Sequence, residues 1–139
     1  MITKLTRSKL ARGAVVATAG VVTTFGLAAG PASAEPRAAI IGQCTTHTLD
    51  YGEGWVPSTS NGNTHCWLER GSNNVGVWAL QMSLRFCYGQ YVGPNGPDRD
   101  YGGNTVQAVK NVQDAYDIAV DGEYGPQTRG VMKFYPACV

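Results

Sequence analysis

The stretch that decides the fold reads Asp121-Gly122-Glu123-Tyr124-Gly125-Pro126-Gln127-Thr128-Arg129-Gly130-Val131-Met132-Lys133. Its order of Asp, Tyr-Gly, Thr and Lys occurs once before, 23 residues upstream, in Asp98-Arg99-Asp100-Tyr101-Gly102-Gly103-Asn104-Thr105-Val106-Gln107-Ala108-Val109-Lys110. A repeat with a period of about 20 to 50 residues indicates one small structural unit that is used again.

Each copy has the pattern of a turn followed by a helix. Asp-Gly and Tyr-Gly pairs favour turns, because glycine tolerates positive φ and an aspartate side chain bonds the nearby backbone. Pro126 suits the first position of a helix, where its missing N–H is not needed. Side chains for one helix face then recur at helical spacing, as Thr128, Val131, Met132 and Tyr135 and, in the first copy, as Thr105, Ala108, Val109 and Val112. Both helices are therefore expected to pack on a common core.

A third helix is predicted ahead of the repeat, at about Asn74 to Phe86. Its inner face is expected to hold Val77, Leu80, Gln81 and Leu84. The two helices of the repeat are expected at about Asn104 to Tyr116 and Pro126 to Tyr135, with Pro136 ending the last one. Three helices on one small core predict an all-α fold, a small three-helix bundle with two repeated turn-helix units.

These motifs together resemble the peptidoglycan-binding domain of bacterial cell-wall hydrolases. That family is a three-helix module with two half-motifs of the form Asp-Gly-x-Phe/Tyr-Gly-x-x-Thr. Its first helix carries Val-x-x-Leu-Gln-x-x-Leu, which occurs here as Val77-Trp78-Ala79-Leu80-Gln81-Met82-Ser83-Leu84. The resemblance covers about residues 69–134. The first copy departs from the pattern, since Arg99 replaces the glycine, Gly103 replaces the proline, and a loop at residues 89–97 precedes it.

The resemblance implies binding to peptidoglycan without catalysis, at a groove bordered by the half-motif turns and the adjoining helices. Carried over by position, the site residues are Asp98, Asp100, Tyr101 and Thr105 in the first copy and Asp121, Tyr124, Gly125 and Thr128 in the second. Backbone N–H groups at a helix start can hold a carboxylate, and aromatic rings can lie against sugar faces. The structural alternative is that the tyrosines lock each turn onto the core and the threonines hydrogen-bond near the helix start.

The first 34 residues have the pattern of a secretory signal peptide. A basic start without acids precedes an apolar run from Ala14 to Ala29 and an Ala-x-Ala cleavage pattern that ends at Ala34. The segment carries four basic residues, which leaves 7 basic and 10 acidic residues and a formal charge of −3 for residues 35–139. This charge disfavours a nucleic-acid partner, and no membrane contact is expected after cleavage. We expect a secreted monomer associated with the cell wall.

The four cysteines, Cys44, Cys66, Cys87 and Cys138, all follow the signal segment. Export into an oxidising compartment favours two disulfides, for which three pairings are possible. Cys44–Cys66 and Cys87–Cys138 are favoured, because Cys87 ends the first predicted helix and Cys138 follows the last. The cysteines are scattered and form no Cys-x-x-Cys pair, so a zinc site is not expected.

Residues 35–68 are expected to form an irregular extension held by Cys44–Cys66, before a peptidoglycan-binding-like domain at residues 69–139. Thr45 to Leu49 is a possible short strand, and Asn61-Gly62 favours a turn or a hairpin tip. Trp55 and Trp67 are candidates for sugar stacking, although a place in the core is more common for such residues.

Three functions remain open from the sequence. The favoured one is a secreted, non-catalytic peptidoglycan-binding protein without a cofactor, which acts alone or beside a separate cell-wall enzyme. The second is a small cell-wall hydrolase that uses His47, His65 and the nearby Asp50 or Glu53, in principle with zinc. Adjacent carboxylates such as Asp98 and Asp100 are better explained by turns and helix starts than by glycoside hydrolysis. The third function is a secreted inhibitor or partner of another protein.

Overall fold

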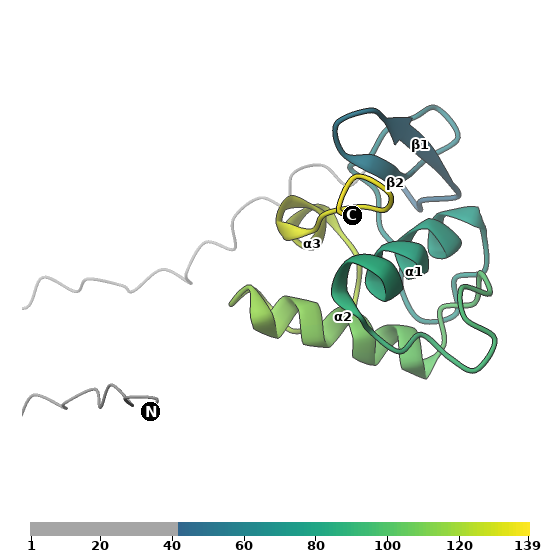
Figure 1. Cartoon of the computed structure of the whole chain (residues 1–139). Coiled ribbons are helices and arrows are strands. Elements are labelled where there is room, and N and C mark those ends of the chain that lie inside the picture. The colour runs from purple at the N-terminus through teal and green to yellow at the C-terminus, as the bar shows by residue number, and fades with distance from the viewer. Residues whose placement is uncertain (1–41) are drawn as a thin grey trace, which may run out of the picture. The chain divides into compact units, whose positions relative to one another are not determined.

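The computed structural model describes residues 42–139, which form three helices and one two-stranded sheet (Figure 1). The elements are β1 (Thr46–Asp50), β2 (Gly54–Ser58), α1 (Val75–Tyr88), α2 (Gly103–Ala115) and α3 (Pro126–Val131). The predicted signal peptide, residues 1–34, lies outside the described residues. The fold is mostly helical, as predicted, but the small sheet means that it is not purely all-α.

The extension expected to be irregular contains an antiparallel hairpin. Thr46 pairs with Ser58 and Asp50 with Gly54, and the carboxylate of Asp50 accepts a hydrogen bond from the N–H of Gly52 in the tip (2.8 Å). The strand predicted near Thr45 to Leu49 is thus confirmed as β1. Residues 59–63, including Asn61-Gly62, form a separate turn in which the N–H of Thr59 bonds the carbonyl of Asn63, so Asn61-Gly62 is not the hairpin tip.

Helix α1 has a clear signal at each end. The Asn74 side chain accepts a hydrogen bond from the N–H of Val77, which caps one of the free donors of the first turn. Gly89 adopts the left-handed conformation (φ 63°) and, with Gln90, closes the last turn onto the carbonyls of Arg85 and Leu84. The predicted inner face is confirmed, since Val77, Leu80, Gln81 and Leu84 are all buried.

Helix α3 ends at Val131, four residues before the predicted end. The chain then runs extended, because its next backbone donors find partners on α1: the N–H of Lys133 bonds the Tyr88 hydroxyl and that of Tyr135 bonds Ser83 Oγ. The Tyr135 carbonyl accepts from the N–H of Trp55 in the hairpin. Tertiary hydrogen bonds therefore override a helical sequence pattern, and they bind the C-terminal segment to both α1 and the sheet.

The core lies among α1, α2 and the two half-motif turns. Its largest fully buried side chains include Tyr101, Tyr124, Leu68, Leu80, Leu84, Gln81 and Gln113. Both favoured disulfides are present: Cys44–Cys66 ties the hairpin segment together, and Cys87–Cys138 joins the end of α1 to the C-terminus. Within residues 42–139, no helix has the length and apolar character to cross a membrane.

Candidate functional site

The second half-motif turn is organised by the buried side chain of Gln113 from α2. Its Nε2 donates to Asp121 Oδ1 (2.7 Å), the Glu123 carbonyl (3.0 Å) and Thr128 Oγ1 (3.0 Å). Its Oε1 accepts from the N–H of Gly122 (2.8 Å). One amide side chain thus connects the end of α2, the turn and the start of α3, and we call these contacts the Gln113 network.

The first half-motif turn makes the same contacts around Gln81 from α1. Nε2 of Gln81 donates to Asp98 Oδ1 (2.9 Å), the Asp100 carbonyl (2.9 Å) and Thr105 Oγ1 (3.0 Å). Its Oε1 accepts from the N–H groups of Asp98 and Arg99 (2.9 and 3.0 Å). We call this the Gln81 network. Asp, turn carbonyl and Thr therefore have the same roles in both copies.

The two turns keep one conformation despite their sequence differences. Arg99, which stands where the half-motif has glycine, has a positive φ of 73°, close to the 78° of Gly122. Gln81 precedes Asp98 by 17 residues, whereas Gln113 precedes Asp121 by 8. Part of this difference lies in the helices, since α1 continues for seven residues after Gln81 and α2 for only two after Gln113, and the rest lengthens the loop at residues 89–97.

The structure separates the eight predicted site residues into buried and accessible ones. Tyr101, Tyr124, Thr105 and Thr128 are buried, Asp98, Asp100 and Asp121 are exposed, and Gly125 is partly exposed. The two turns are brought together, because the Tyr101 hydroxyl donates to the Gly122 carbonyl (2.9 Å). Contact between these residues and a ligand stays a prediction. The buried side chains hold the turns in shape, and the exposed carboxylates form their outer edge.

The two buried tyrosines allow a matched test of their structural role. Tyr101 has its hydroxyl partner in Gly122, whereas the Tyr124 hydroxyl is buried without a hydrogen-bond partner among residues 42–139. Burial also raises the pKa of both hydroxyls far above the ordinary range. We expect Tyr101→Phe to lower the free energy of unfolding by about 1 kcal/mol and Tyr124→Phe to leave it unchanged or to raise it. Urea unfolding of both variants checks this; an equal loss in the two would contradict it.

Each turn presents carboxylates to solvent. Asp98 and Asp121 use Oδ1 in the glutamine networks and in bonds to the backbone N–H two residues later. Their Oδ2 atoms, like the side chains of Asp100 and Glu123, accept no hydrogen bond within residues 42–139. We call these four exposed acids the acidic rim. The hydrogen bond from Gln81 lowers the pKa of Asp98, so its stabilising effect is present above the ordinary carboxyl pKa and is lost as pH falls.

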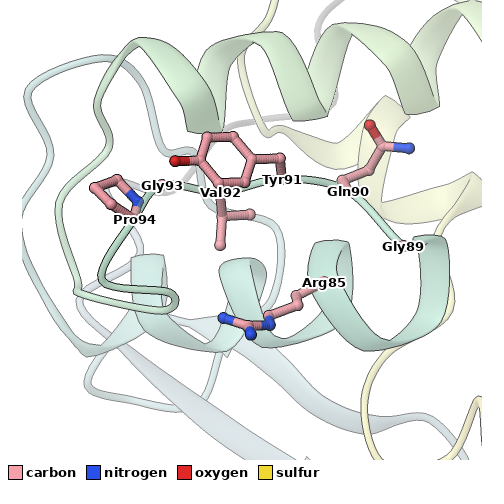
Figure 2. Close-up of a pocket in the computed structure, with 7 residues that line it drawn as sticks. All are labelled: Arg85, Gly89, Gln90, Tyr91, Val92, Gly93 and Pro94. Carbon is pink, nitrogen blue, oxygen red and sulfur yellow. The ribbon is translucent and has the colours of Figure 1, made fainter.

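Sequence reasoning missed Gln113. The repeat is recognised from its turns, whose aspartates are 23 residues apart, whereas Gln81 and Gln113 are 32 residues apart. Sequence reasoning also did not mark the cavity beside the long loop of the first turn (Figure 2). This cavity of about 360 Å³ is lined by Arg85 at the end of α1 and by residues 89–94 of the loop. No motif marks it, since it depends on the path of the loop.

The two histidines lie in different surroundings. His47 lies against Trp55 and Trp78, with ring centroids 5.8 Å from each, and burial lowers its pKa. His65 is exposed on the segment that leads to Cys66. Residues 42–139 contain no group of three His, Cys, Asp or Glu side chains placed to hold a metal ion. Trp55 is part of an aromatic cluster that packs the hairpin on α1, and Trp67 is likewise only partly exposed.

Comparisons with known proteins agree with this geometry. Residues 73–132, which contain both glutamine networks, match the family described as "Putative peptidoglycan binding domain". The chain is 42% identical over 71 residues to the N-acetylmuramoyl-L-alanine amidase CwlL of Bacillus licheniformis. That match covers 51% of this chain and 19% of the amidase, so the chain spans about a fifth of that relative.

Among solved structures, the SleB N-terminal domain is similar at 30% sequence identity, with a TM-score of 0.43. The similarity covers 48% of this chain and 86% of that domain. The family match spans α1, α2, α3 and both half-motif turns. Through residues 73–132, this chain belongs to the peptidoglycan-binding domain family.

Proposed function

We propose that this protein binds bacterial peptidoglycan outside the cell and does not cleave it. The observation that carries the proposal is the pair of turns held by Gln81 and Gln113, within a segment that matches the peptidoglycan-binding family. The two disulfides fit an extracellular, cell-wall location. His47 Nδ1 is buried without a hydrogen-bond partner among residues 42–139, which supports binding rather than hydrolysis.

The acidic rim indicates which part of the wall polymer the turns contact. Peptidoglycan offers sugar hydroxyls, peptide N–H groups and free amino groups, all of which donate hydrogen bonds. A carboxylate with a free oxygen accepts such bonds and gains strength where the donor is charged. The four rim acids outnumber the nearby cations Arg99 and Lys110, whose side chain lies against Gly122. The rim therefore suits these donors and repels carboxylates of the stem peptide.

Asp100 and Glu123 allow the rim to be tested without disturbing the fold. They occupy equivalent positions, and only their backbone atoms take part in the glutamine networks. We expect the double variant Asp100→Ala/Glu123→Ala to bind insoluble peptidoglycan several-fold more weakly, since each exposed pair contributes about 0.2–1 kcal/mol. The measurement is the bound fraction after sedimentation, at a series of wall concentrations.

Asp114→Ala, which removes an exposed acid of α2 whose side chain takes no part in the glutamine networks, is the matched control. It should bind as the unchanged protein does. Equal binding by the rim variant and the control would exclude Asp100 and Glu123 from the contact surface. Failure of the unchanged protein to sediment with the wall would overturn the proposed function itself.

A further inference from the structure

The cavity beside the first turn has an unpaired guanidinium at its wall. Arg85 is the one charged residue among those lining the cavity, and Figure 2 shows its side chain extending from α1 below Val92 of the loop. Within residues 42–139 it makes no ion pair and no side-chain hydrogen bond. Arg129, by contrast, is paired with Glu53 at 2.7 Å.

The surroundings of Arg85 fix its position without neutralising its charge. The guanidinium carbon lies 5.6 Å from the centre of the Phe86 ring, in the range of a cation–π contact. Gly96 also lies against the guanidinium, since an added Cβ atom there would be 2.5 Å from Arg85 Nη1. The glycine thus leaves the space that the guanidinium occupies, and all five N–H donors of the fork stay available.

The loop adds further groups for a ligand. Tyr91 is 64% exposed at the edge of the cavity, so its ring can cover an apolar or peptide group. No hydrogen bond within residues 42–139 uses the backbone N–H groups of Tyr91, Val92 or Gly93. The cavity therefore combines a charged fork and an accessible ring with lining residues whose backbone donors are unused within residues 42–139, a set that suits an anionic peptide end.

We propose that this cavity binds a carboxylate of the peptidoglycan stem peptide through Arg85, with Tyr91 against the adjoining peptide. The inference rests on the proposed function and adds to it a second contact of opposite charge. The acidic rim repels carboxylates, whereas an arginine fork matches their two oxygens. The cavity is lined by the loop of the first turn, which is longer than its counterpart between α2 and the second turn.

The test compares Arg85→Gln with Arg70→Gln, which removes the same charge from an exposed residue before α1. The probes are soluble disaccharide peptides released from peptidoglycan, with free or with amidated carboxylates, and walls stripped of phosphate polymers. We expect Arg85→Gln to weaken binding of the free-carboxylate peptides about tenfold to a hundredfold, as for a hydrogen bond to a charged group. Arg70→Gln should bind as the unchanged protein does, and amidation should reproduce the loss.

Each other outcome has a distinct meaning. Equal binding by Arg85→Gln and Arg70→Gln, with the unchanged protein still bound to walls, would overturn the inference and leave the proposed function intact. An effect of Arg85 that disappears on phosphate-free walls would assign the cavity to phosphate and overturn the carboxylate. No binding by the unchanged protein to any probe or wall would overturn the proposed function and the inference with it. Thermal unfolding of both variants within about 2 °C of each other shows that the fold is kept.

Discussion

Replacing Gln113 by alanine lowers the free energy of unfolding by about 3–5 kcal/mol, the range expected when a buried polar network is broken. The side chain makes four hydrogen bonds and is fully buried. Its removal leaves the Gly122 N–H and the Thr128 hydroxyl without that partner, and it opens a cavity. Gln81→Ala should lower the free energy of unfolding by a similar amount, because Gln81 makes the corresponding contacts in the first turn.

Chemical denaturation with a matched control checks this result. Gln107 lies on the same helix as Gln113 but is exposed, and its side chain bonds only Asn111. Gln107→Ala should therefore change the free energy of unfolding by less than about 0.5 kcal/mol. A loss below about 1 kcal/mol for both Gln81→Ala and Gln113→Ala would show that the networks do not hold the turns.

Removal of the Cys87–Cys138 disulfide, by Cys87→Ala and Cys138→Ala together, lowers the free energy of unfolding by about 4 kcal/mol. The bond closes a loop of 51 residues in sequence separation, which contains α2, α3 and both half-motif turns. The loss arises mainly in the unfolded state, because the unfolded chain has more conformational entropy once the disulfide is removed. It is comparable with the whole net stability of a small domain.

The m-value, which is the slope of the free energy of unfolding against denaturant concentration, distinguishes an effect on the unfolded chain from a loss of native contacts. If the unfolded chain expands, the m-value of the double variant rises together with the loss of stability. An unchanged m-value and a loss below about 1 kcal/mol would mean that non-covalent contacts alone hold the C-terminal segment. Those contacts include the hydrogen bonds of Lys133 and Tyr135 to α1 and the bond from Trp55 N–H to the Tyr135 carbonyl.

The inner face and approximate range of α1 were predicted well, because both follow from local sequence. The helix ends are also set locally, by the Asn74 cap and the left-handed Gly89, although these two roles were not predicted. The disulfide pairing followed from the helix order. The hairpin was only half predicted, because Gly54 and Pro57 make β2 a poor strand by propensity. Its position depends on the contact with α1 and the C-terminal segment.

The features that depend on three-dimensional placement were not predictable. Tyr135 has helical spacing from Thr128, yet its N–H bonds Ser83 of α1 and the helix ends before it. Burial of Tyr101 and Tyr124 in the core was one of two interpretations that the sequence allowed, and the structure shows both side chains fully buried. From the sequence alone, Arg85 is a cation in the last turn of a helix, where it stabilises the helix dipole. Only the course of the loop shows that it also lines a cavity.

The measurement that tests the central claim most directly is sedimentation of the purified protein with insoluble peptidoglycan. Both the bound fraction and the soluble wall fragments are recorded over several hours. The predicted result is saturable binding to the pellet without release of fragments. Release of fragments by the unchanged protein would contradict a purely binding function, and a protein that stays in the supernatant would contradict peptidoglycan binding.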